Sequence, residues 1–275
     1  MKNERQLKLI ANHNRKRIVE MVYRAGVGHV GGSLSVIDFL TAIYENEVDF
    51  TEKRRTRVVL SKGHAVPAIY AELAEKGIVD ESLFSTFRQI NSKLQGHPYI
   101  CDIPEVDATT GLLGQGFSIA VGMAVVKKNE GDPHKVYAVA GDGEMQEGQI
   151  WEALISAAHY KLDNLVFILD YNKLSSSHPT NEVISLEPIA DKLKAFNYYV
   201  IDIDGHDMEQ ILSAIEKAKG VKGMPVMIIA NTVKGKGVSF MENVPKWHSS
   251  GLTDEEYEIA MRDLDKKEEE LVHAV

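Results

Sequence analysis

An α/β fold, built on a parallel sheet with helices on both faces, is the architecture that this sequence predicts. Short apolar runs rich in strand-forming residues alternate along the chain with longer stretches of helical period. Such a rhythm is typical of βαβ units, whose strands lie parallel in one sheet. No internal repeat, low-complexity tract or Pro/Gly/Ser-rich linker divides the 275 residues, so we expect residues 1–275 to form a single domain.

The elements follow from the same pattern. Five short apolar runs dominated by strand-forming residues are expected to be strands, at 57–60, 135–140, 165–170, 198–203 and 226–230. Seven longer stretches of helical period are expected to be helices, at 4–23, 34–44, 66–76, 117–128, 149–160, 207–219 and 254–272. Open parallel sheets bind ligands beyond the carboxyl ends of their strands. The residues that follow the strands are therefore the first candidates for a functional site.

Composition and charge exclude several classes of protein. Hydrophobic residues make up 44% of the chain and charged residues 26%, ordinary values for a globular protein, and no apolar run is long enough to cross a bilayer. With 31 basic against 40 acidic residues the formal charge is −9, which argues against a surface for nucleic acid or for an anionic membrane. The charged first residues, MKNERQLKLI, lack the apolar core of an export signal, so a cytoplasmic location is expected.

Cys101 is the single cysteine of the sequence. It has no partner for an intramolecular disulfide, and no thiol cluster is available for zinc or iron–sulfur chemistry. Any bound metal must therefore be held by oxygen atoms or imidazoles.

The most informative stretch is the Gly-Asp-Gly tripeptide at 141–143, which ends an apolar strand shortly before a predicted helix. Glycines let the backbone approach a phosphate closely, and a helix N-terminus offers free N–H groups to an anion. Because the carboxylate of Asp142 would repel a diphosphate, a hard cation such as Mg²⁺ is expected between them. After the next strand, the Asn172 side chain and the Leu174 carbonyl could complete the oxygen ligands of that ion.

Taken alone, the tripeptide predicts no more than a tight turn, because glycine and aspartate favour turns for reasons unrelated to ligands. Gly141, Gly143 and Gly148 do not fall into the G-x-G-x-x-G spacing of dinucleotide-binding proteins, so a Rossmann dehydrogenase is disfavoured. The functional interpretation depends on the second segment, Tyr171-Asn172, which follows after an intervening helix and strand.

The pairing of Gly-Asp-Gly with Tyr-Asn resembles the thiamine-diphosphate-binding motif, and other segments resemble the transketolase family specifically. GHVGGSLS at 28–35, SKGHAVPAIYA at 61–71, GHP at 96–98 and TTGLLGQG at 109–116 stand in the order that transketolases show. The resemblance covers most of the chain, from Gly26 to Leu252. It implies the domain that binds the diphosphate half of thiamine diphosphate.

The resemblance also implies roles for individual residues, each at a position that matches the family's motifs. The Mg²⁺ ligands would be Asp142, Asn172 and the Leu174 carbonyl. The cofactor contacts would be Gly111, Leu113, Gly143, Asn172, His64, His248 and Glu147, the last of which links two cofactor sites across a subunit interface in the family. The catalytic histidines would be His29 and His97 on the substrate side, with His64 and His248 at the diphosphate.

Histidines suit a site that holds phosphate, donates hydrogen bonds to sugar hydroxyls and moves their protons. His29, His64 and His97 each follow a glycine in a predicted loop and lie within a matched motif. The segment 234–237 follows a strand and could lean toward phosphate, but an exposed basic loop explains it equally well. The other histidines are interpreted as surface or structurally satisfied residues: His13, His134, His159, His178, His206 and His273.

The activity that the resemblance implies is ketol transfer, in which the thiazolium C2 carbanion of the cofactor attacks a ketose and a two-carbon unit passes to an aldose. In the family, the glutamate that promotes this ionisation lies on a pyrimidine-binding domain, for which the present sequence has no counterpart. A C-terminal transketolase subunit carrying that glutamate is therefore the expected partner, in an α₂β₂ assembly, with phosphorylated sugars as substrates. The chain is expected to be inactive without it.

Three alternatives remain. A split enzyme of specialised sugar catabolism, acting on a modified ketose phosphate or a sulfosugar, would carry the same motifs, and Val27, Val30 and Tyr171 depart from residues common in transketolases. Another thiamine enzyme is disfavoured: the ordered motifs argue against a 2-oxo acid dehydrogenase subunit, and the short chain argues against deoxyxylulose-phosphate synthase. A non-catalytic cofactor-binding homologue is disfavoured by the retained metal ligands and histidines.

Overall fold

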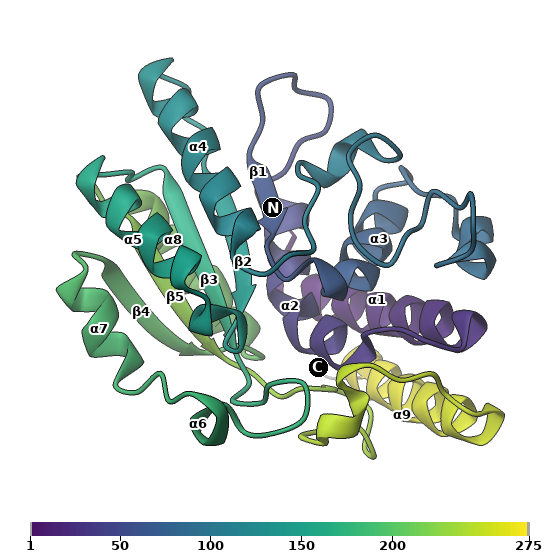
Figure 1. The fold of residues 1–275 in the computed structure, drawn as a ribbon. Helices are drawn as coiled ribbons and strands as arrows, with labels where there is room; N and C mark the ends of the chain where they lie inside the picture. The colour runs from purple at the N-terminus through teal and green to yellow at the C-terminus, as the bar shows by residue number, and fades with distance from the viewer. Residues whose placement is uncertain (1, 274–275) are drawn as a thin grey trace.

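A five-stranded parallel sheet of order β1-β2-β3-β5-β4 lies at the centre of the computed structural model, which describes residues 2–273 (Figure 1). All neighbouring strands are parallel. The predicted sheet is confirmed, and each observed strand begins and ends within one residue of its prediction. The strands are β1 Arg57–Leu60, β2 Val136–Gly141, β3 Leu165–Tyr171, β4 Tyr199–Asp204 and β5 Val226–Asn231.

Helices cover both faces of the sheet, as expected. In Figure 1, α4 and α5 lie in front of the sheet and α8 lies behind it. The first face packs against α4 Gln115–Asn129, α5 Gly148–His159 and α7 Ile189–Ala195. The second face belongs to the cluster formed with α1 Glu4–Ala25, α2 Val30–Asn46, α3 Val66–Glu75, α8 Met208–Gly220 and α9 Asp254–His273. The single-turn helix α6, Thr180–Val183, lies in the connection from β3 to α7.

The strands read as nearly continuous apolar runs because both faces of the sheet are covered. Every residue of β3 is buried, and alternate residues contribute to opposite hydrophobic clusters: Val166 and Ile168 to one, Phe167 and Leu169 to the other. The chain adds strands in one direction up to β4 and then returns to place β5 between β3 and β4. Right-handed crossovers require the connecting helix to change face at this reversal, which is why α8 lies opposite α5 and α7.

Six of the seven predicted helices match within two residues at each end, whereas α2 begins at Val30 rather than at 34. Gly31 and Gly32 are poor helix formers and obscured the first turn in the sequence. Packing explains the glycine at position 31, because an added Cβ would lie 2.6 Å from the Trp247 carbonyl oxygen. The seven-residue helix α7 was not predicted at all.

One buried carboxyl group makes the stability of the folded state depend on pH. Glu72 on α3 is fully buried; its carboxyl accepts hydrogen bonds from Thr41 and, at 2.9 Å, from Asn14, while its second oxygen has no partner among the described residues. Burial, together with the nearby Glu45 carboxylate, raises the pKa of Glu72 from 4.5 to about 8. The folded state thus holds this proton more tightly than the unfolded state, and stability falls as pH rises from 4.5 to about 8.

We therefore expect Glu72→Gln, which imitates the protonated carboxyl, to be more stable than the wild type above neutral pH. The gain should rise to as much as about 5 kcal/mol at alkaline pH and vanish near pH 4.5, because each pKa unit between 4.5 and about 8 corresponds to about 1.4 kcal/mol. Urea unfolding of both proteins at several pH values measures it. Glu258→Gln, at an exposed position of α9, should show no such trend. A difference independent of pH would contradict the assignment to Glu72 ionisation.

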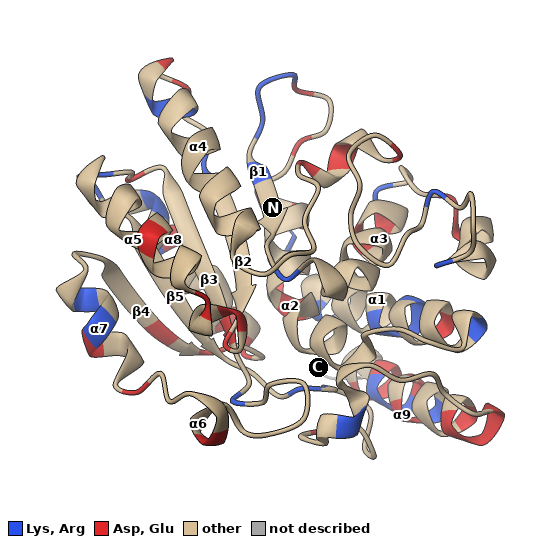
Figure 2. Cartoon of the chain, viewed as in Figure 1, with Lys and Arg blue, Asp and Glu red and all other residues tan. Residues whose placement is uncertain are grey.

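None of the helices described between residues 2 and 273 is long and apolar enough to span a membrane. Basic and acidic residues are interspersed over the helices, and acidic residues gather in the turn that follows β2 (Figure 2). This turn leads from the carboxyl edge of the sheet toward α5, where the sequence predicted a binding site.

Candidate active site

A cavity of about 540 Å³ opens at the carboxyl edge of the sheet. It is built from the first turn of α2 and the loops that follow β1, β2, β3 and β5, so residues distant in sequence meet there. All eleven residues with a role predicted from the sequence line this one cavity: His29, His64, His97, Gly111, Leu113, Asp142, Gly143, Glu147, Asn172, Leu174 and His248.

Three of the four predicted histidines form a cluster. The ring centroid of His29 lies 4.9 Å from that of His64 and 5.3 Å from that of His248, and the latter two are 5.2 Å apart. Burial lowers the pKa of His29 to about 4, helped by the positive charge of Arg88, and burial lowers that of His248 to about 4, helped by Lys234. The imidazoles are therefore neutral near pH 7, when each can accept one hydrogen bond and donate another.

The histidine cluster also contains an unused polar atom. His29 Nδ1 is buried and has no hydrogen-bond partner among the described residues. His97 lines the same cavity and lies against Gly111, where an added Cβ would be 3.2 Å from the His97 ring. Because a buried nitrogen without a partner costs free energy, this arrangement favours a ligand that supplies the missing hydrogen bond.

The acidic part of the cavity brings together the ends of β2 and β3. Asp142 accepts hydrogen bonds from the backbone N–H of Gly143 at 2.8 Å and from that of Lys173. Burial and the neighbouring Asp170 carboxylate raise the pKa of Asp142 to about 7. Since a buried carboxylate beside another carboxylate is costly without a counter-charge, this position favours a bound cation.

Asn172 has its amide oriented by its neighbours. Its Nδ2 donates to Asp170 at 3.2 Å, and its Oδ1 accepts the Leu174 N–H at 3.1 Å. No group of three His, Cys, Asp or Glu side chains within residues 2–273 is arranged to hold a metal. A metal here would be held by one carboxylate, one amide oxygen and one backbone carbonyl, hard oxygen donors that suit Mg²⁺ and leave positions for phosphate oxygens.

Lys234 lines the cavity, and its sequence context left two interpretations open: a lysine that leans toward phosphate, or part of an exposed basic loop. It is only 2% exposed, and its ammonium donates to the carbonyls of Leu174 at 2.8 Å and Ser175 at 2.7 Å, with His248 Nδ1 at 3.4 Å. The interpretation of this segment as an exposed basic loop is therefore wrong for Lys234. Burial lowers its pKa to about 8. The signal in the sequence was only its place after a strand.

Lys62 and Glu144 were also missed, although Lys62 lies inside the 61–71 motif and Glu144 directly follows the Gly-Asp-Gly tripeptide. The buried ammonium of Lys62 pairs with Asp170 and donates to the Gly32 carbonyl at 2.8 Å, which joins β1, β3 and the first turn of α2. The buried Glu144 carboxylate accepts from the Ser61 hydroxyl and from the N–H groups of Gly114 at 2.8 Å and Gly141 at 3.3 Å.

These two residues therefore fix the loops around the cavity. Burial raises the pKa of Glu144, against the effect of its three donors. Glu147, at the N-cap of α5, is exposed at the rim of the cavity and makes no capping hydrogen bond, so its predicted role across an interface stays a prediction.

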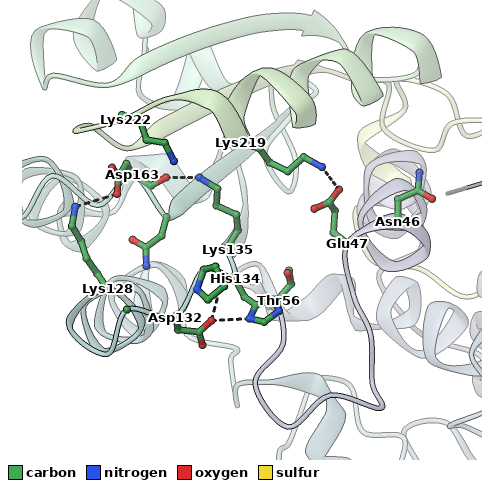
Figure 3. A pocket seen from close by; sticks show the side chains of 13 residues that line it. Asn46, Glu47, Thr56, Lys128, Asp132, His134, Lys135, Asp163, Lys219 and Lys222 are labelled. Carbon is green, nitrogen blue, oxygen red and sulfur yellow. Dashed lines mark hydrogen bonds and ion pairs between the residues drawn. The ribbon is translucent and has the colours of Figure 1, made fainter.

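A second cavity, of about 550 Å³, lies at the opposite edge of the sheet near the amino ends of β2 and β3 (Figure 3). Two of its four lysines pair with carboxylates: Lys128 with Asp163 at 3.1 Å and Lys219 with Glu47 at 2.9 Å. We assign it no role, because none of the recognised motifs reaches it.

The chain belongs to the transketolase family. The family model described as "Transketolase, thiamine diphosphate binding domain" matches residues 6–271. The chain is 42% identical over 270 residues to one of the subunits of the apulose-4-phosphate transketolase of Phocaeicola vulgatus, with 96% of each chain covered. It is 44% identical over 265 residues to the SqwG subunit of the 6-deoxy-6-sulfo-D-fructose transketolase of Clostridium sp., with 94% of this chain and 95% of the relative covered.

Transketolases of the long type match over part of their length. The human transketolase is 36% identical over 255 residues, which are 90% of this chain and 40% of the human one. The crystal structure of the Campylobacter jejuni transketolase superposes with a TM-score of 0.89 at 33% identity, covering 96% of this chain and 43% of that chain. The fold and the family predicted from the sequence are thus confirmed.

Proposed function

We propose that this chain is the diphosphate-binding subunit of a two-chain transketolase. With thiamine diphosphate and Mg²⁺ bound, and with a C-terminal subunit, it transfers a two-carbon ketol unit from a ketose phosphate to an aldose phosphate. The convergence of all eleven predicted residues on one cavity carries the proposal. The family match to the thiamine-diphosphate-binding domain supports the cofactor, and the oxygen donors beside Asp142 support the metal.

The residues of the cavity divide by position. Asp142, Asn172 and the Leu174 carbonyl would hold Mg²⁺, while the Gly143 N–H and the Lys234 ammonium would meet the diphosphate. When bound, thiamine diphosphate supplies a nucleophilic carbon that can hold a two-carbon unit. His64 and His248 face the diphosphate end through their closeness to Lys62 and Lys234.

His29 and His97 are proposed to serve the substrate. A neutral imidazole can donate a hydrogen bond to a sugar oxygen with one nitrogen and accept a hydroxyl proton with the other. His29 Nδ1 is free for such a contact, and burial lowers the pKa of His97 as well, with a contribution from Arg88. These side chains would hold the sugar hydroxyls and move their protons during bond cleavage.

A partner subunit is proposed because the relatives matched along nearly their whole length are named as subunits. Apolar side chains are exposed beside the cavity, namely Leu112 at 78% and Val183 at 49%. Exposed apolar groups around a site favour a protein surface that covers them. We propose one partner per chain and an α₂β₂ assembly, in which the partner supplies the pyrimidine-binding domain and the activating glutamate.

A second candidate differs in substrate only. The two subunit relatives are named for apulose-4-phosphate and for 6-deoxy-6-sulfo-D-fructose, and both are more similar to this chain than the human transketolase is. A donor from specialised sugar catabolism, a branched ketose phosphate or a sulfonated ketose, is therefore the alternative. Turnover of a panel of ketose donors by this chain and its C-terminal partner tests both candidates, and binding of thiamine diphosphate without turnover of any donor would point to a non-catalytic homologue.

The division of the histidines gives a prediction in the reconstituted enzyme. His29→Ala and His97→Ala should lower kcat/KM by about 100-fold, a common value for loss of an acid–base group, with little change in cofactor affinity. His64→Ala should lower both kcat/KM and cofactor affinity, because His64 is more deeply buried in the cavity than His29 and His97 and lies next to Lys62. Steady-state kinetics and cofactor titration measure the two quantities. His13→Ala, on the exposed side of α1, is the matched control. Equal losses of cofactor affinity in all three variants would contradict the division.

A further inference from the structure

A buried polar network lies directly behind the segment that carries Lys234 into the cavity. Its centre is Asp38 on α2, whose two carboxylate oxygens accept from Arg15 Nη1 at 3.0 Å and Nη2 at 2.6 Å. His206, in the loop after β4, places Nδ1 2.8 Å from the same carboxylate. We name Arg15, Asp38 and His206 the Asp38 network. No sequence motif points to it, and from the sequence His206 is interpreted as a surface or structurally satisfied residue.

The Asp38 network forms hydrogen bonds with the backbone on both sides of Lys234. His206 Nε2 accepts the N–H of Val233 at 2.8 Å, and Arg15 Nε donates to the carbonyl of Lys236 at 3.1 Å. His206 and Arg15 thus each contact the Asp38 carboxylate with one nitrogen-bearing part of the side chain and hydrogen-bond the backbone of segment 233–236 with another.

Two backbone contacts complete the anchoring of this segment. The N–H of Gly235 donates to the Gly31 carbonyl at 3.0 Å, and the Lys234 carbonyl accepts the N–H of Asn243 at 2.9 Å. Gly31 belongs to the first turn of α2, whose N-cap is the cavity residue His29. The segment is therefore tied to the same helix that carries Asp38, and Lys234 has a fixed point of departure toward Leu174 and Ser175.

The hydrogen bonds define the tautomer of His206. A backbone N–H can only donate, so Nε2 must be the unprotonated nitrogen and Nδ1 must carry the proton that meets Asp38. Asp38 must be the acceptor and hence ionised. Although burial acts to raise it, Arg15 and His206 hold the pKa of the Asp38 carboxyl well below its usual value. A carboxylate that sets the tautomer of a histidine, which in turn holds a third group, is a common supporting arrangement at functional sites.

We propose that Asp38 and His206 are positioning residues for cofactor binding: by holding Val233, with Arg15 holding Lys236, they fix the ammonium of Lys234 at the diphosphate end of the cavity. The inference depends on the proposed function for the identity of the ligand, and on the observed contacts alone for the anchoring. Neither residue lines the cofactor cavity, so any effect on affinity must pass through the segment.

Two substitutions separate the two ends of His206. In His206→Asn the amide nitrogen replaces Nδ1 and keeps the bond to Asp38, but the acceptor for Val233 is lost. In His206→Gln the amide oxygen replaces Nε2 and keeps that acceptor, but the bond to Asp38 is lost. His134→Asn is the matched control, because His134 also pairs through Nδ1 with an aspartate, Asp132, at 2.7 Å, yet lies at the opposite edge of the sheet.

The experiment uses the full chain together with its C-terminal partner and measures two quantities: hydrogen exchange of peptides that cover residues 232–237 of this chain, and the affinity for thiamine diphosphate in the presence of Mg²⁺. We expect His206→Asn to speed exchange of this segment and to weaken cofactor affinity by about 10-fold, the usual effect of losing a supporting contact behind a bound group. His206→Gln should keep most of the exchange protection of this segment and most of the cofactor affinity. His134→Asn should change neither.

A double-mutant cycle then tests whether the effect passes through Lys234. Lys234→Met removes the ammonium and keeps much of the apolar stem, so His206→Asn should cost little further affinity in that background. The same 10-fold loss with and without the ammonium would overturn the positioning role, and so would unchanged exchange in His206→Asn. Absence of cofactor binding by the wild type would instead overturn the proposed function, and it would be seen before any variant is made, while the exchange data would still decide whether His206 anchors the segment.

Discussion

Purified without a partner, the chain is expected to show no two-carbon transfer. Among the described residues, three carboxylates line the cavity, and none is placed as the glutamate that would activate the cofactor. Asp142 lies at the proposed metal, Glu144 accepts hydrogen bonds from three donors, and Glu147 is exposed at the rim. The glutamate that promotes ionisation of the cofactor in this family is therefore proposed to come from the C-terminal subunit. Losing such a group should lower turnover by at least about 10³-fold.

A ketose-to-aldose transfer assay measures this effect with each of the two chains in isolation and with mixtures of both. Activity should rise with added partner and saturate at equal amounts, because each site needs one half from each chain. Light scattering should show self-association of the isolated chain, driven by exposed apolar groups such as Leu112. Robust turnover by the isolated chain would overturn the two-chain proposal.

The second large effect is expected at the metal site. Asp142→Ala and Asn172→Ala should each weaken binding of thiamine diphosphate by about 100-fold or more, because the diphosphate charge is then no longer balanced by a well-held cation. For the same reason cofactor and Mg²⁺ should each bind weakly without the other. Calorimetric titration of one in the absence and presence of the other measures this mutual dependence.

These variants should keep the fold, since both residues lie on loops at the ends of strands. Removal of Asp142 also relieves its repulsion from Asp170, so thermal unfolding of the cofactor-free variant should occur no lower than that of the wild type. Asp191→Ala, on the surface of α7, is a matched control that should bind the cofactor normally. Undiminished affinity in both site variants would show that the metal is held elsewhere or is not needed.

The sequence alone determined the sheet and predicted many of the residues that line the cavity. Strands such as β3 are apolar at nearly every position, a signal that depends on composition and length rather than on distant contacts. The site residues follow glycines or strand ends in ordered motifs, and the carboxyl ends of parallel strands necessarily meet at one edge. Their convergence on one cavity could therefore be expected before the structure was known, although their individual roles remain predictions.

Tertiary structure decided what local patterns could not express. The first turn of α2 forms despite two glycines because Gly31 must lie against Trp247, and a propensity argument cannot anticipate that contact. In the sequence, Lys234 cannot be distinguished from a lysine of an exposed basic loop. In the fold, the reversal of strand order at β4 places β5 next to β3, and the loop after β5 therefore lies against Leu174.

The same reason explains the Asp38 network. Asp38 and His206 are separated by 168 positions in the sequence, and only the packing of α2 against the loop after β4 brings them within 2.8 Å. The sequence predicted the groups that are proposed to do the chemistry, because that chemistry requires particular residue types at strand ends. The tertiary structure showed which groups hold the cavity residues in place. A supporting contact can form between many types of side chain, and it depends on which of them the fold packs together.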